Sequence, residues 1–115
     1  MNIYWTKKFI AFNKKYWGGA LKSIPVYVKP MDENYGEYYH PNEDWPDEPQ
    51  RIILDQGMKH RHKENVLLHE MAHHAVFEKY GNASYHHHCS KWKKEMRRCG
   101  FTGKINKDTA FNKRN

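Results

Sequence analysis

The stretch LLHEMAHHAV, residues 67–76, constrains the fold more than any other part of this sequence. It places three histidines and one glutamate among leucine, methionine, alanine and valine, so a helix here has to bury ionisable groups. A buried charge is costly unless it is paired or bound to a metal ion. His69 and His73 are four residues apart, which puts both imidazoles on one face of a helix, with Glu70 one position round from His69. The pattern predicts a buried helix that holds either a metal site or ordinary core histidines.

The HExxH spacing of these residues favours the metal site. In that arrangement the two histidines bind zinc and the glutamate takes a proton from a zinc-bound water. We therefore expect one Zn²⁺ held by His69 and His73, with Glu70 as the general base of a metallopeptidase. Ordinary core histidines are the weaker alternative, because they leave the buried Glu70 without a function. His74 would face away from His69 and Glu70, towards a supporting position or the surface.

A catalytic zinc needs a third protein ligand in addition to a water. The same helix does not supply it, because Lys79 and Val76 stand where the metzincin arrangement has its third histidine and its glycine. The stretch YHHHCSKW that follows offers three more histidines. We choose His88, because it is in phase with the apolar Trp92 and Met96 of the next expected helix and would point inward. The weaker alternatives are His86, His87 and Cys89.

The remaining periodicity predicts a small α+β domain. Aromatic residues spaced as on one side of a helix mark the first element: Trp5, Phe9, Phe12 and Tyr16. The expected elements are a helix at about 5–17, strands at 24–28, 35–39 and 51–55, and helices at about 63–80 and 90–99. This order indicates a minimal zincin-like fold: an N-terminal helix, a small three-stranded antiparallel or mixed sheet, the zinc helix and a C-terminal helix.

The length of 115 residues predicts one domain, which we expect to cover residues 1–103 and to be followed by a basic flexible tail at 104–115. The sequence contains neither a signal-peptide core nor an apolar run of about 18 residues, so we expect a cytoplasmic, monomeric protein without a membrane segment. Cys89 and Cys99 would be about 15 Å apart along one helix, which is too far for a disulfide. Free thiols fit a reducing compartment.

The charge is distributed unevenly along the chain. Residues 31–50 contain seven of the 13 acidic residues and no Lys or Arg, which leaves 20 cations against six acids elsewhere. Such a basic surface would bind phosphate backbones through counterion release, or would simply be solvated. The candidate nucleic-acid contacts are Lys59, Arg61, Lys91, Lys93, Lys94, Arg97 and Arg98.

Four segments in order resemble the SprT-like (Spartan) family of zinc metallopeptidase domains, and together they span about residues 9–101. FNKKYWGGAL is similar to the family's Phe-Asn-x-x-Tyr-Phe opening helix. Strands ending in IILD and the helix LLHEMAHHAV follow, and HCSKW resembles the family's His-Gly-x-x-Phe segment, which also selects His88 as the third ligand. Cys89 replaces the usual glycine and Trp17 the usual phenylalanine. The cysteine-rich zinc ribbon that follows the domain in many members is not found in this sequence.

The resemblance implies a zinc-dependent endopeptidase that cleaves DNA-bound or DNA-crosslinked protein, as in DNA–protein crosslink repair. Its partners would be a protein substrate and DNA, including single-stranded DNA. A stand-alone domain of this size would suit a bacterium or a bacteriophage, in the second case acting in the host cytoplasm. Two alternatives stay open: a nucleic-acid-binding module with a structural or vestigial zinc site, and a peptidase indifferent to DNA.

Overall fold

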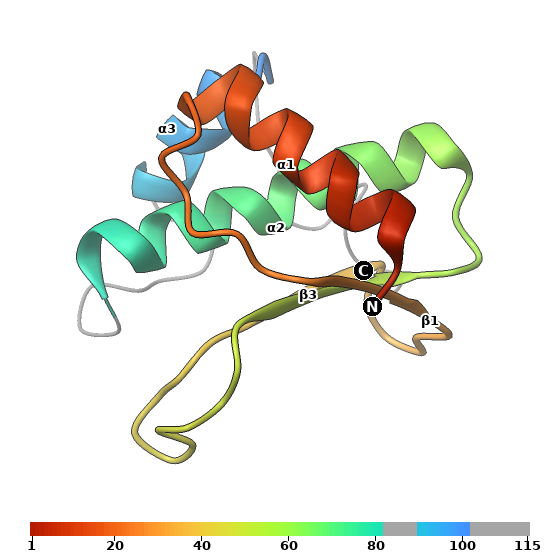
Figure 1. Ribbon diagram of the computed structural model, residues 1–115, viewed down its shortest axis with the longest axis horizontal. Helices are drawn as coiled ribbons and strands as arrows, with labels where there is room; N and C mark the ends of the chain where they lie inside the picture. Colours follow the sequence, from red (N-terminus) through yellow and green to blue (C-terminus); the bar gives the residue numbers. More distant parts are fainter. Residues whose placement is uncertain (82–89, 102–115) are drawn as a thin grey trace.

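The computed structural model describes residues 1–81 and 90–101, which form a three-stranded sheet with helices on one face (Figure 1). In chain order the elements are α1 (Ile3–Trp17), β1 (Val26–Lys29), β2 (Gly36–Tyr39), β3 (Arg51–Asp55), α2 (His60–Tyr80) and α3 (Ser90–Arg98). The predicted α+β class is confirmed. The expected domain boundary at 103 and the tail at 104–115 lie outside the described residues. No helix in the described part of the chain is long and apolar enough to cross a membrane.

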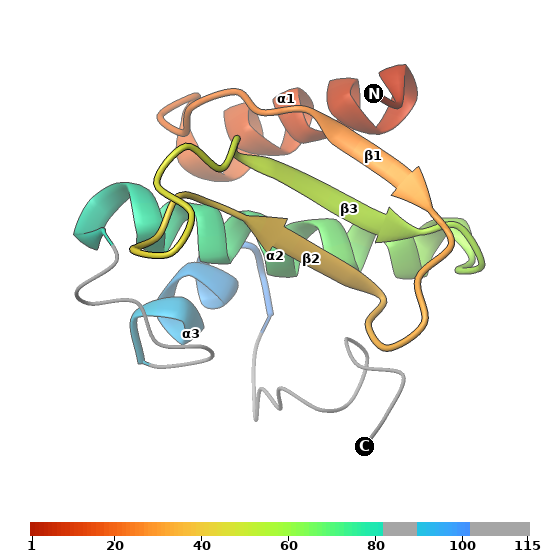
Figure 2. The ribbon, with the colours of Figure 1, turned by 90° about the horizontal axis from the view of Figure 1, so that it is seen from below.

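The sheet is mixed, with the strand order β1-β3-β2 (Figure 2). β1 runs parallel to β3, and β2 runs antiparallel to β3. Val26, Ile52 and Leu54 are fully buried beneath the helices. Among the described residues β2 pairs only with β3, so it is an edge strand, and α3 lies on the same side of the molecule (Figure 2).

α1 covers the β1 side of the sheet, and its ends follow from local chemistry. The Asn2 side chain accepts a hydrogen bond from the Trp5 backbone N–H at 2.9 Å, and the helix ends at Gly18, whose φ of 61° favours glycine. The buried side chains along it are Trp5, Phe9, Asn13 and Trp17. Phe12 and Tyr16, which we expected on this stripe, are half-buried at its margin.

α2 crosses the middle of the molecule and is buried on every side from Val66 to Val76. The sheet, α1 and α3 surround it, which explains why apolar residues are not confined to one stripe. The helix ends before Gly81 as expected, but it begins at His60 rather than near Lys63. His60 packs on the first turn of α1, where the Tyr4 hydroxyl lies 2.7 Å from its Nε2 atom, so tertiary contacts extend the helix by one polar turn.

α3 packs against α2 through Trp92 and Met96, both fully buried. Glu95 lies between the three helices and accepts hydrogen bonds from Trp17 Nε1 at 2.9 Å and Lys79 Nζ at 3.2 Å. A buried carboxylate bound by donors from two other helices holds α3 in a defined orientation on α2.

Candidate metal centre

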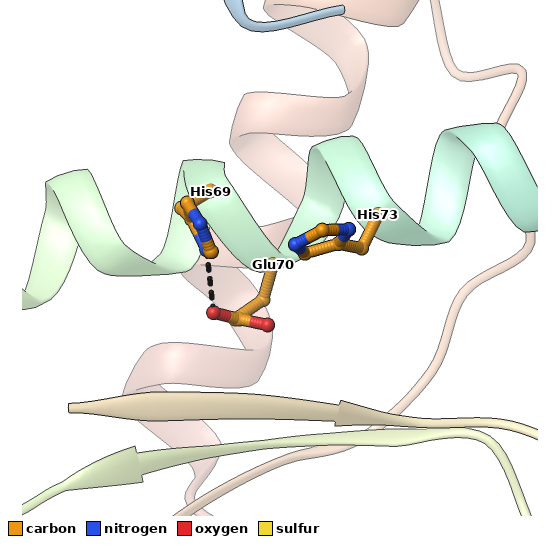
Figure 3. Close-up of side chains that lie close together, drawn as sticks. All are labelled: His69, Glu70 and His73. Carbon is orange, nitrogen blue, oxygen red and sulfur yellow. Dashed lines mark hydrogen bonds and ion pairs between the residues drawn. The ribbon is translucent and has the colours of Figure 1, made fainter. Parts of the chain in front are cut away.

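The side chains of His69, Glu70 and His73 meet midway along α2 (Figure 3). One ligand atom from each residue lies within 4.8 Å of the other two. The two imidazole centroids are 4.8 Å apart, and the ring planes are inclined at 82°. The exposed fractions of His69, Glu70 and His73 are 4%, 4% and 2%, so the cluster is almost completely shielded from solvent. The structure thus brings together all three residues that the HExxH spacing indicated.

The donor set of this cluster fits a zinc ion. Two imidazoles and one carboxylate are nitrogen and oxygen ligands of the kind that zinc prefers, and their burial would strengthen their interaction with a cation. His69 Nδ1 lies 2.6 Å from Glu70 Oε2. If His69 carries its proton on Nδ1, it donates to this carboxylate and keeps the Nε2 lone pair for an ion. The hydrogen bond also holds Glu70 beside the imidazole that would bind the metal.

Trp92 of α3 forms one wall of the cluster. Its ring centroid lies 5.0 Å from that of His69 and 5.6 Å from that of His73, and it is stacked on His73 at an interplanar angle of 23°. Its Nε1–H donates to the backbone carbonyl of His69 at 3.3 Å. The sequence indicated that Trp92 is a core residue, but not that it touches both histidines. The only signal was its position four residues after His88.

β2 passes directly over the part of α2 that carries Val66 and Glu70, and the closest approach is at Gly36. A Cβ atom on this residue would lie 2.5 Å from Val66 Cγ1 and 3.4 Å from Glu70 Cγ, so only glycine allows the strand to come this close. The Glu70 carboxylate extends from α2 towards the strands (Figure 3). Sequence reasoning missed this approach, although a glycine inside a strand often marks one.

His74 is fully buried one turn after Glu70 and, like Glu70, faces β2, so the expectation that it faces away from Glu70 and the surface alternative for it are both wrong. Its Nε2–H donates to the Lys22 carbonyl at 2.8 Å, and its Nδ1 lies 3.0 Å from the Tyr38 hydroxyl, which donates to it. Burial lowers the pKa of His74, outweighing the hydrogen bond to Lys22. A neutral His74 therefore joins α2 to β2 and to the chain after α1.

The structure describes only some of the other predicted site residues, namely the candidates for the third zinc ligand and for nucleic-acid contacts. His88, its alternatives His86 and His87, and Cys89 lie outside the described residues, so the third ligand stays a prediction. Lys59 and Arg61 are exposed at the beginning of α2. On α3, Lys94, Arg97 and Arg98 are exposed, whereas Lys91 and Lys93 are half-buried. The candidate nucleic-acid contacts therefore lie on two separate elements.

Comparison with known proteins gives one match. The model of the SprT-like family matches residues 5–111, which is nearly the whole chain and includes α2 and the segment that contains His88. No curated protein and no solved structure matches the chain.

Proposed function

This chain belongs to the SprT-like family, and on that premise we propose that it is a zinc-dependent endopeptidase acting on proteins bound or crosslinked to DNA. The observation that carries the peptidase proposal is the buried cluster of His69, Glu70 and His73, whose ligand atoms lie within 4.8 Å of one another. A structural zinc site has no use for the carboxylate of Glu70, whereas a hydrolytic site needs a base at that place.

We assign the zinc to His69, His73 and His88. When bound there, the ion would supply Lewis acidity, which makes a water more acidic and polarises the carbonyl of the peptide bond. His69 and His73 would bind the ion through imidazole nitrogens, and the hydrogen bond between His69 and Glu70 restrains the orientation of the His69 ring. Trp92 of α3 packs against both rings and restrains them further.

Glu70 is the base in this mechanism. Its carboxylate takes the proton from the attacking water and returns it to the amine nitrogen as the peptide bond breaks. Because Glu70 is almost fully buried and bonded to His69, its carboxylate is already oriented before substrate arrives. This pre-organisation contributes to the rate because no reorientation is needed during the reaction.

The DNA part of the proposal is supported by the charge distribution. Outside residues 31–50 the chain carries 20 cations against six acids, and several of these cations are exposed on α3 and at the beginning of α2. Contact with phosphates would bring the enzyme and a DNA-bound target together and raise the effective concentration of the substrate.

The test is cleavage of a DNA-binding protein such as a histone, with and without single-stranded DNA. The wild type is compared with Glu70→Gln, with a chelator-treated sample, and with Glu78→Gln as a matched control. Glu78 is an exposed glutamate on the same helix, so the control makes the same chemical change away from the cluster. We expect Glu70→Gln to lose activity by a factor of about 10² to 10⁴ while retaining zinc and its unfolding temperature.

Two results would overturn the proposal. Full activity of Glu70→Gln would exclude this glutamate as the base. No cleavage by a wild type that binds one zinc and has measurable DNA affinity would instead indicate a nucleic-acid-binding module. Cleavage that is equally fast without DNA would contradict the proposed role of DNA and leave the peptidase proposal standing.

A further inference from the structure

A concave site separate from the metal cluster lies at the end of β2, where the strand enters the 41–50 loop. It is a pocket of about 430 Å³ lined by Tyr38, Tyr39, His40, Asn42, Trp45 and Glu48. Four of these six side chains are rings and one is a carboxylate. None of them belongs to the His69–Glu70–His73 cluster, and the proposed hydrolysis does not use them.

The loop that closes this pocket is held by a specific turn. The Asn42 side-chain oxygen accepts hydrogen bonds from the backbone N–H groups of Asp44 and Trp45, both at 3.0 Å. The Trp45 carbonyl accepts two more, from the N–H groups of Asn42 and Glu48, both at 3.2 Å. This turn places Trp45 at the pocket with 67% of its surface exposed. An indole that an ordered turn holds at the surface offers its aromatic face to a ligand.

The electrostatics of the pocket favour a cation. The 41–50 loop carries four acids, Glu43, Asp44, Asp47 and Glu48, and no Lys or Arg. The adjacent cation is Arg51, which pairs with Glu48 at 2.7 Å and lies 4.1 Å over the ring of Tyr39. One guanidinium is thus already held by a carboxylate and an aromatic face at the wall of the pocket. The other three loop acids keep the surroundings negative.

The pocket is connected to the candidate metal centre by β2. At the start of the strand Gly36 lies against Glu70, and Tyr38 then packs on His74 with centroids 5.2 Å apart. Just beyond the strand, His40 packs on Phe77 at 4.5 Å. At about 3.3 Å per residue, the distance from Gly36 to the pocket is about 10 to 13 Å, which an extended peptide covers in three or four residues.

We propose that this pocket is a specificity site for a cationic side chain, Lys or Arg, of the protein substrate. The cation would stack on the Trp45 indole and be attracted by Glu48 and the other loop acids. The site lies three or four residues from the bond that is cut. This position rests on the proposed function, whereas the binding of a cation by the pocket does not.

Binding is measured by quenching of Trp45 fluorescence. The other three tryptophans are at most 7% exposed, so a soluble quencher reaches mainly Trp45. In the zinc-loaded Glu70→Gln protein, we expect caesium to quench more strongly than iodide when each is compared with its quenching of free tryptophan, because the loop is acidic. Peptides with a single Arg or Lys should protect Trp45 from acrylamide, and otherwise identical peptides with Gln or Leu should not. Equal protection by the Leu peptide, or protection by none at millimolar concentration, would overturn the proposal.

Two variants locate the effect in the pocket. Glu48→Gln should weaken binding of the Arg peptide about fivefold, because it removes one carboxylate from the pocket and leaves the positive charge of Arg51 without its ion-pair partner. Asp32→Asn is the matched control, since it removes one charge from the same acidic segment at an exposed position outside this pocket. Equal weakening by both variants would show a diffuse field rather than a site.

The link to catalysis is tested by mapping cleavage sites in an unfolded protein by mass spectrometry. In the wild type we expect Lys or Arg to be enriched at one position three or four residues from the cut bond. Trp45→Ala should lose this enrichment and still cleave, and Trp45→Tyr should largely keep it. Binding without enrichment would overturn the role in substrate selection. If no protein is cleaved at all, the proposed function fails, and the quenching experiment still decides whether the pocket binds cations.

Discussion

Trp92 is the residue of α3 that contacts the candidate metal centre. Its indole contacts the rings of both His69 and His73 and also donates to the backbone of His69. It is fully buried, so it cannot move away without opening the core. We conclude that Trp92 is a positioning residue, which restricts both imidazoles to orientations from which they can share one ion.

The first prediction concerns this restraint. Trp92→Leu should lower the zinc affinity about tenfold or more, because both rings lose a wall, and Trp92→Phe should have a smaller effect because it keeps an aromatic face. The affinity is measured by competition with a chromogenic chelator. Met96→Ala, which also removes buried side-chain volume one turn further along α3, is the control for a general loss of packing. Unchanged affinity in a folded Trp92→Leu protein would show that the ligands hold their own orientation.

The second prediction concerns Cys99, which is buried after α3. Burial raises the pKa of its thiol to about 12, from an ordinary value of 9.0. The folded pKa lies above the unfolded one, so this group's contribution to the free energy of unfolding is complete below pH 9.0 and is lost as the pH rises towards 12. In a Cys89→Ser background at pH 8.5, iodoacetamide should label the native protein about a hundredfold more slowly than the urea-unfolded one. Similar rates would mean that Cys99 is accessible in the native state.

At the scale of whole elements, the sequence predicted those features that depend on interactions between residues close together in the chain. Strand 51–55 and the ends of α1 and α2 at Gly18 and Gly81 were visible in the sequence, because β-branched runs and glycines act over a few residues. The strand order β1-β3-β2 was not predictable, because pairing between distant segments leaves no local signal. The earlier start of α2 has the same origin, since α1 contacts stabilise a turn whose own sequence is polar.

The candidate site divides in the same way. His69, Glu70 and His73 could be predicted because they lie on one helix, where the spacing alone sets their relative positions. The wall formed by Trp92 and the close approach of Gly36 depend on packing between elements, so they required the structure. Asn13 is a further example. Its buried side chain binds both backbone groups of Leu21, which no periodicity of apolar residues could indicate.

The third prediction concerns the contact between β2 and α2. Gly36→Ala should lower the free energy of unfolding by about 1 to 3 kcal/mol, because the new methyl group would overlap Val66 and force the strand away from the helix. It should also reduce peptidase activity through displacement of Glu70. Urea unfolding of Gly36→Ala, Val66→Ala and the double variant forms the test. The double variant should be more stable than additivity allows, and strict additivity would contradict the contact.

At the scale of the whole molecule, opposite charges occupy different regions of the chain. The acidic residues 31–50 belong to β2 and the loops at its two ends, whereas exposed cations lie on α3 and at the beginning of α2. In the proposed function these regions have different partners. The acidic region would receive a cationic side chain of the substrate, and the basic helices would contact phosphates, so one positively charged substrate and one negatively charged polymer could bind together without competing.

The last prediction tests the basic helices directly. Replacing Lys94 and Arg97 by Gln removes two exposed cations, so two phosphate contacts should be lost. The logarithm of the affinity for single-stranded DNA should then fall less steeply with the logarithm of the salt concentration, with a slope shallower by about 1.4 for the pair. The matched control replaces Lys7 and Lys14, two exposed cations on α1, in the same way. Fluorescence anisotropy of a labelled oligonucleotide between about 50 and 200 mM salt measures both slopes.

If the α1 control changes the slope as much as the α3 variant, the DNA contact is spread over the basic surface and α3 is not its site. If the wild type shows no salt-dependent binding, the basic surface serves solubility alone.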